Sequence, residues 1–134
     1  MSYQKIFFLT ILFTFNSLSH ATKWYVKHNA SGSNNGTSWT NAYNALQDAI
    51  NASSASDEIW VAAGTYKPTR IPSSGAASSS SRDLAFYLNK DLKLYGGFAG
   101  TETTLNQRDI SANPVIRLTK DSILPLYILG ATIL

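Results

Sequence analysis

The sequence contains no cysteine, which excludes disulfide bonds and thiolate metal sites. Histidine is almost as scarce, and His28 is the one histidine beyond residue 21, so neither a catalytic triad nor a histidine zinc cluster is expected. Charged residues make up 14% of the chain, and the net charge of +3 is scattered without a basic face. We therefore expect no nucleic-acid partner. The 134 residues suffice for one modest domain, which without disulfides must bury its core well or belong to a larger body.

The N-terminal segment, residues 1–21, has the pattern of a secretory signal peptide. Lys5 supplies a positive start, Ile6–Phe15 is apolar, and Ser19-His20-Ala21 places small residues before a cleavage point. The apolar run is too short to cross a bilayer core of about 30 Å, which takes roughly 20 residues. We therefore predict cleavage near Ala21, no transmembrane span afterwards, and a location outside the cell, at the cell surface or at the outer membrane.

Short strands that end on turn residues dominate the remainder of the chain. The composition predicts strands at Lys23–Lys27, Ile59–Ala62, Leu84–Leu88, Leu92–Tyr95 and from Val115–Ile116 onward. Gly64 and Gly96-Gly97 are expected to end two of these strands, with Phe98 re-entering the core after the second. The similar strand–glycine units indicate coils of a solenoid.

Side-chain alternation predicts which face each residue of a strand occupies. Trp24 and Val26 fall on one face of the first strand and Tyr25 on the other. Trp60 is the largest apolar side chain of its strand, and we expect it to pack under the helix or against Tyr66.

One short amphipathic helix is predicted between the first two strands. Its apolar residues recur at spacings of three and four from Ala42 to Ile50, and Thr40 or Asn41 can cap it. Before it, Asn29–Thr37 is rich in turn-forming residues. We expect the helix to cover the open apolar end of a stack of strands.

Two other segments lack a clear strand or helix pattern. Thr69–Arg82 is a long loop of small polar residues with nothing to bury. Residues 117–134 form an atypical apolar tail, in which Pro125 and Gly130 disfavour a membrane helix. This tail is either a buried strand of a further coil or a self-associating surface.

Three segments together resemble a known class of proteins. WYVKHNASGSNNGTSWTNAYNALQDAI, then DEIWVAAGTYKPT, then LKLYGGFAGTETTLNQRD, are similar in order and spacing to the N-terminal region of secreted right-handed parallel β-helix repeat proteins. These are large pectin-lyase-like surface proteins of Gram-negative bacteria, some of them polymorphic outer-membrane-protein-like and many carrying a type IX secretion sorting domain. The resemblance covers roughly residues 24 to 116.

The resemblance implies a mainly β fold. Residues 22–116 would form an N-terminal cap helix and the first coils of a right-handed parallel β-helix. From Arg117 onward the sequence departs from the pattern of the family, and no sorting domain follows. We therefore expect a truncated or frameshifted product, a fragment whose open β-helix end can self-associate.

The sequence offers few groups for catalysis. Asp57 and Glu58 are adjacent, so on a strand they point to opposite faces and suit solvated positions better than a paired-carboxylate site. Asp83 and Asp91 flank the second predicted strand but lie in no dense acidic loop that would hold Ca²⁺. Arg108 and Asp109 are expected to fix a turn, and His28 to lie at the surface. We assign no catalytic, cofactor-binding or metal-binding residue.

Three functions remain open at this point. The preferred hypothesis is a secreted or surface-exposed structural module of adhesin type, without catalysis of its own. The first alternative is a fragment of a pectin-lyase-like polysaccharide lyase or hydrolase, whose calcium-binding acids and basic residue would lie on later coils. The second is a small carbohydrate-binding module that uses exposed aromatic rings. The expected partners are polysaccharides or cell-surface glycans.

Overall fold

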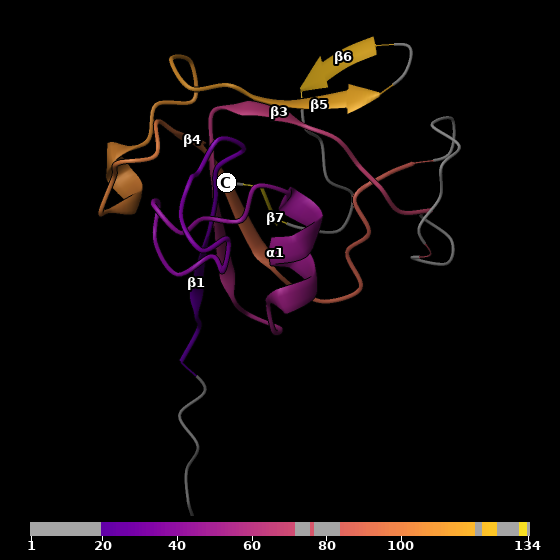
Figure 1. Cartoon of the computed structure of the whole chain (residues 1–134), viewed down its shortest axis with the longest axis horizontal. Helices are drawn as coiled ribbons and strands as arrows, with labels where there is room; N and C mark the ends of the chain where they lie inside the picture. Colours follow the sequence, from indigo (N-terminus) through magenta and orange to yellow (C-terminus); the bar gives the residue numbers. More distant parts are fainter. Residues whose placement is uncertain (1–19, 72–75, 77–83, 120–121, 126–131, 134) are drawn as a thin grey trace, which may run out of the picture.

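The computed structural model describes residues 20–71, 76, 84–119, 122–125 and 132–133 (Figure 1). The predicted leader lies almost wholly outside these residues, as does most of the loop between Thr69 and Arg82. Along the chain the elements are β1 (Lys23–Val26), α1 (Leu46–Ala52), β2 (Glu58–Ala62), β3 (Gly64–Tyr66), β4 (Lys93–Phe98), the 3₁₀ turn η1 (Leu105–Gln107), β5 (Val115–Thr119), β6 (Ser122–Pro125) and β7 (Thr132–Ile133).

The main sheet is parallel throughout and has the order β1-β2-β4-β7. The order of the strands in the sheet is their order along the chain, although β3 lies between β2 and β4 and β5 and β6 lie between β4 and β7. Lys23 lies beside Glu58, and Glu58 lies beside Lys93. Parallel neighbours need a long crossover connection, and the segments between these strands supply it. The mainly β fold predicted from the sequence is confirmed, with open, mainly parallel sheets and little helix.

A second sheet, with the order β3-β5-β6, lies across one end of the first (Figure 1). The chain passes from β2 to β3 at Gly64, whose φ is 153°. Glycine adopts this backbone conformation readily, whereas it is strained for other residues. A Cβ at Gly64 would also lie 2.3 Å from the His28 Nδ1 atom. This corner therefore requires glycine. Strand β2 ends at Ala62, before Gly64, as predicted, and Gly64 then opens β3.

The larger apolar core lies on the face of the main sheet that α1 covers. Helix α1 contacts β1 and β2. The buried residues of this core come from the helix, from β1, β2 and β4 of the main sheet, from β3 of the second sheet and from the loop before β4: Val26, Leu46, Ala49, Ile50, Ile59, Val61, Tyr66, Leu92 and Leu94. As predicted, Val26 packs here with Trp24 against it, and Tyr25 faces the other way.

The opposite face of the sheet carries an aromatic core. Trp60, Tyr95 and Phe98 form it, and Tyr25, Trp39 and Leu105 pack around it. The Trp60 and Phe98 rings are stacked, with their centroids 4.6 Å apart and their planes at 8°. The expected burial of Phe98 is confirmed. The predicted place of Trp60 under the helix or against Tyr66 is wrong, because Ile59 and Val61 face the helix and the residue between them must face away.

The helix begins later than predicted. Helix α1 starts at Leu46 after Ala45, with no side-chain cap, so neither Thr40 nor Asn41 caps it. The Tyr43 N–H donates to the Tyr25 carbonyl and the Lys27 N–H donates to the Tyr43 carbonyl, at 2.9 Å each. Pairing with β1 therefore fixes the backbone at Tyr43 in an extended form, and the helix can start only beyond it.

The strand predicted at Leu84–Leu88 does not form. Ala85 makes a single antiparallel bridge to Arg70. The Tyr87 backbone is satisfied by a side chain instead: its N–H donates to Gln47 Oε1 at 3.0 Å, and its carbonyl accepts from Gln47 Nε2 at 3.1 Å. Gln47 is only 2% exposed, so these bonds are made away from solvent.

Gly96 and Gly97 do not break the third strand. Strand β4 continues through both to Phe98, with an irregularity in its pairing to β2 between Trp60 and Ala62. Gly97 has a φ of 92°, and a Cβ there would lie 2.9 Å from Ile110 Cγ1. The glycines thus allow a bulge and a close approach of the following loop within a continuous strand.

The predicted apolar tail is partly described. Strand β5 extends the predicted start at Val115–Ile116 to Thr119, and β6 returns antiparallel to it. Strand β7 adds two residues to the main sheet beside Lys93 and Leu94. Within the described ranges, no helix has the length and apolar character needed to cross a membrane.

Candidate functional site

The outer edge of β1 is covered by the chain itself. Residues 36–43 run beside it. The Tyr25 N–H donates to the Gly36 carbonyl at 3.0 Å, and Tyr43 uses both its N–H and its carbonyl to pair with the β1 side, at Tyr25 and Lys27. A Cβ at Gly36 would lie 2.5 Å from the Tyr43 ring, so the close passage depends on glycine there. The first strand of the sheet therefore presents no free ladder at these residues.

A network of asparagine side chains holds this covering loop in shape. Asn44 Nδ2 lies 3.0–3.3 Å from three carbonyl oxygens, those of Lys27, His28 and Ala30. The Asn44 N–H donates to Asn34 Oδ1 at 2.8 Å, and the Ser33 N–H donates to Asn41 Oδ1 at 3.0 Å. The predicted turn character of Asn29–Thr37 is confirmed, with positive φ at Asn34 and Gly36. Asn44 itself was not singled out from the sequence, because its partners become neighbours only in the folded loop.

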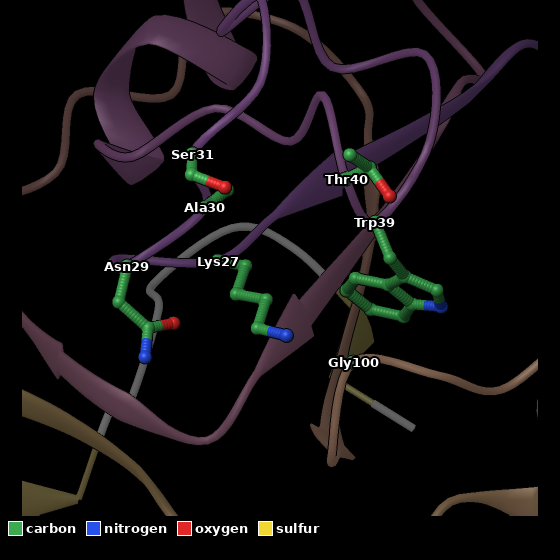
Figure 2. A pocket seen from close by; sticks show the side chains of 7 residues that line it. All are labelled: Lys27, Asn29, Ala30, Ser31, Trp39, Thr40 and Gly100. Carbon is green, nitrogen blue, oxygen red and sulfur yellow. The ribbon is translucent and has the colours of Figure 1, made fainter.

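Where this loop meets the end of β4, it leaves a shallow pocket of about 180 Å³ (Figure 2). We call it the corner pocket. Its lining is Lys27, Asn29, Ala30, Ser31, Trp39, Thr40 and Gly100. In the view of Figure 2 the Lys27 ammonium group lies between the Asn29 side chain and the Trp39 ring. The pocket thus combines one cation, two hydroxyl groups, one amide and one aromatic ring.

The floor of the corner pocket is a tight turn that Glu102 ties together. Its carboxylate accepts hydrogen bonds from the N–H groups of Ala99, Gly100 and Thr101 at 2.6–2.9 Å. Burial tends to raise the pKa of Glu102, but these bonds outweigh it and hold the pKa below its ordinary value. The Trp39 indole N–H donates to the Glu102 carbonyl at 2.8 Å. Trp39 is therefore fixed at the wall of the pocket.

Lys27 reaches the pocket by crossing Gly100. A Cβ on Gly100 would lie 3.0 Å from both Cδ and Nζ of Lys27, and Gly100 has a φ of 95°. Within the part of the chain that the structure describes, the ion pair formed is Lys93–Glu58, with Nζ and Oε1 3.9 Å apart, and it does not involve Lys27. The Lys27 ammonium group thus lacks a carboxylate partner among these residues.

The acidic residues considered from the sequence have structural contacts. Asp57 is 4% exposed and accepts hydrogen bonds from the Thr22 N–H, the Trp24 indole and the Ser54 N–H at 2.7–2.9 Å. The prediction that Asp57 is solvated is wrong: it stands at the entrance of β2, where it joins the starts of β1 and β2. Glu58 accepts from the Trp60 indole at 3.3 Å and faces Lys93.

The remaining candidates have no shared site. Asp109 accepts from the Ser111 and Ala112 N–H groups at 2.9 Å and fixes a turn, as predicted, while Arg108 lies over the Tyr95 ring at 5.5 Å. His28 is exposed, as expected, and faces Tyr66 edge-on. Asp91 is exposed and Asp83 lies outside the described residues. In the described ranges, no group of three or more histidine or acidic residues gathers as metal ligands would.

Comparison with known protein families, with curated proteins and with solved structures finds no match to this chain.

Proposed function

We propose that this chain is the end module of a parallel β-solenoid in a secreted or surface-exposed protein of adhesin or display type. The observation that carries the proposal is the difference between the two edges of the main sheet. Residues 36–43 cover the edge of β1, whereas pairing continues in parallel from β1 through β2 to β4. A sheet closed at one edge and extended by parallel strands at the other suits a terminal unit, because solenoids need capping repeats.

The columns of side chains across the strands support the same proposal. Trp24, Ile59 and Leu94 are register partners on the helix side, and Tyr25, Trp60 and Tyr95 are partners on the aromatic side. In a solenoid each coil buries its apolar face against its neighbours, so like residues stack in columns. A right-handed β-helix, an exported location and glycan partners are the finer parts of the proposal, and they rest on the sequence pattern given above.

A polysaccharide lyase or hydrolase is less well supported than a structural module. The two adjacent carboxylates, Asp57 and Glu58, are engaged with the ends of β1 and β2 and with Lys93. Neither is presented as one of a pair flanking a substrate bond.

Replacing Tyr43 by proline tests the capping role. Proline removes the N–H that bonds the Tyr25 carbonyl, and we expect a loss of stability of about 1–3 kcal/mol together with self-association of the folded protein. Light scattering and size-exclusion chromatography measure the association, and Tyr43→Phe, which keeps the N–H, is the matched control. A Tyr43→Pro protein that associates no more than the control and is equally stable would argue against the cap.

Hydrogen exchange of the unaltered protein provides a second test. The Tyr25 and Lys27 amides both donate to the covering segment, so they should exchange as slowly as amides within β2. Fast exchange at both positions would mean that the β1 edge is open, and the capping proposal would then fail.

A further inference from the structure

We propose that Asn35 is a site of spontaneous deamidation, which the covering loop holds back and which, once it has occurred, releases that loop from β1. Asn35-Gly36 is the one Asn-Gly pair in the sequence. Glycine has no Cβ to shield its backbone nitrogen, so this nitrogen can reach the side-chain carbon Cγ of the preceding asparagine. The Asn35 side chain is exposed, whereas Gly36 is buried beside β1. The reactive pair therefore lies between solvent and the covered edge.

The reaction needs water and no other reagent. The Gly36 nitrogen loses its proton and forms a bond to Asn35 Cγ, the bond from Cγ to Nδ2 breaks, and ammonia leaves a five-membered succinimide ring behind. Water then adds to one of the two ring carbonyls and opens the ring, without any oxidation or reduction. One opening gives aspartate. The other gives isoaspartate, in which the backbone runs through Cγ and gains one methylene carbon.

Thr37 prepares the carbon that is attacked. Its N–H and its hydroxyl both donate to Asn35 Oδ1, at 3.2 Å and 2.7 Å. Two donors on one amide oxygen draw electron density away from Cγ and stabilise the negative charge that this oxygen gains during the attack. The side-chain amide of Asn35 is therefore already polarised in the folded protein.

The fold withholds the attacking nitrogen instead. The Gly36 N–H donates to the Asn41 carbonyl at 2.8 Å, and the Asn35 N–H donates to the same oxygen at 2.9 Å. On its other side Gly36 accepts from the Tyr25 N–H, and a Cβ on Gly36 would lie 2.5 Å from the Tyr43 ring. A peptide held in this way resists both loss of its proton and rotation toward Cγ. The attack therefore requires this part of the loop to leave β1 first.

The reaction changes the loop in one direction only. An isoaspartate at position 35 lengthens the backbone between the two N–H groups that bond Asn41, so the register with Tyr25 is lost. Gly36 is already packed against the rings of Tyr43 and Trp24, and the added carbon would displace either the rings or the loop. A loop that has opened and reacted does not close again on β1. This release rests on the capping role proposed above, whereas the gated reaction at Asn35 does not.

The test of the gate compares the folded chain with the same chain unfolded in guanidinium chloride, at one pH and temperature. Peptide mapping by mass spectrometry measures loss of the Asn35 amide, and enzymatic methylation distinguishes isoaspartate from aspartate. We expect folding to slow the reaction roughly 10- to 100-fold and to protect the Gly36 amide from hydrogen exchange by a similar factor, because both processes need the same opening. Asn34, which is exposed in the same loop but followed by a residue with a Cβ, is the internal control and should react far more slowly.

Two results would overturn the gated site. Equal rates in the folded and unfolded chains would mean that the loop withholds nothing. Formation of aspartate alone in the unfolded chain would mean that no succinimide forms and that Gly36 is not the nucleophile.

Substitution at Tyr43 links the gate to the covered edge. Tyr43→Pro removes a bond that holds the loop on β1 and should bring the folded rate close to the unfolded rate, whereas Tyr43→Phe keeps that bond and should react as the parent does. An unchanged rate in Tyr43→Pro would refute control by the β1 edge. Should Tyr43→Pro fold poorly, the exchange comparison on the unaltered protein decides the same point.

Size-exclusion chromatography tests the release. Aged protein enriched in isoaspartate by ion exchange should self-associate. Asn35→Asp adds the same charge without the extra backbone carbon, keeps an acceptor for Thr37 and should elute as the parent does. If the isoaspartate form elutes as the parent does while Tyr43→Pro associates, the cap stands and the release is wrong. If neither associates although folding still slows the reaction, the capping role and the release fail together and the gated site stands.

Discussion

Asp57 gives the sharpest test of how the first two strands are joined. Its Oδ1 accepts from the Thr22 N–H, and its Oδ2 accepts from both the Trp24 indole and the Ser54 N–H. Alanine would leave these three donors without their acceptor at a site that is 4% exposed. Each buried donor left unpaired costs about 1–3 kcal/mol, and partial hydration lowers the sum, so we expect Asp57→Ala to destabilise the fold by roughly 3–5 kcal/mol.

Asp57→Asn should destabilise the fold less than Asp57→Ala does. The asparagine side chain keeps one oxygen as an acceptor. Its NH₂ group is a donor, and it must face other donors: either the Thr22 N–H, or the Trp24 indole and the Ser54 N–H. We expect a loss of about 1–3 kcal/mol. Urea unfolding followed by tryptophan fluorescence measures both variants, and Asp91→Asn, which changes an exposed carboxylate, is the control. A loss below about 0.5 kcal/mol for Asp57→Ala would refute this account of the junction.

The pH dependence of stability follows from the same bonds. Burial tends to raise the pKa of Asp57, but the hydrogen bonds from Ser54, Trp24 and Thr22, with the nearby charge of Lys90, hold it below its ordinary value. The unfolded pKa is about 3.9, so the contribution of Asp57 is present above that pH and is lost as the pH falls through the lower, folded pKa. Asp57→Asn should flatten this part of the acid unfolding curve, whereas Asp91→Asn should leave it unchanged.

Two further predictions concern the aromatic core and the strand order. Trp60→Ala should lower the free energy of unfolding in urea by about 3–5 kcal/mol, because it removes a ring that is stacked on Phe98 inside the core. Ile110→Ala, at a side chain that is 62% exposed, should lower it by only about 0.5 kcal/mol. Equal losses for the two variants would contradict the aromatic core. The chain has no cysteine, so an introduced pair of cysteines can be tested without competing thiols. A Lys23→Cys/Glu58→Cys double variant should form a disulfide on oxidation, because residues paired on adjacent parallel strands lie about 4.8 Å apart. Lys23→Cys/Lys93→Cys joins positions two strands apart and should stay reduced, which mass spectrometry can show; the opposite result would overturn the order β1-β2-β4.

Local patterns predicted the features that depend on neighbours in sequence. The alternation at Trp24, Tyr25 and Val26 placed these side chains on the correct faces of β1. The asparagines and glycines of the covering loop predicted its turns, and Phe98 was expected to be buried. These outcomes follow from backbone geometry and side-chain chemistry that act within a few residues.

The candidate site was not predictable in the same way. The corner pocket joins Lys27 to Gly100, and the junction at Asp57 joins Thr22 to Ser54, across long separations in sequence. Asp57 has nothing in its local sequence that distinguishes a buried acceptor from a solvated acid. Lys27 likewise acquires its position only because Gly100 allows its side chain to pass.

The short strands, the one helix and the glycine-dependent corners of this protein follow from the intrinsic preferences of the residues. Contacts between distant parts of the chain set where each element starts and stops. Pairing of Tyr43 with β1 delayed the helix to Leu46, Gln47 satisfied the backbone that was predicted as a strand at Tyr87, and a bulge carried β4 through Gly96 and Gly97. In each case a backbone group found its hydrogen-bond partner far along the chain, and a buried backbone group must be paired whatever its local preference.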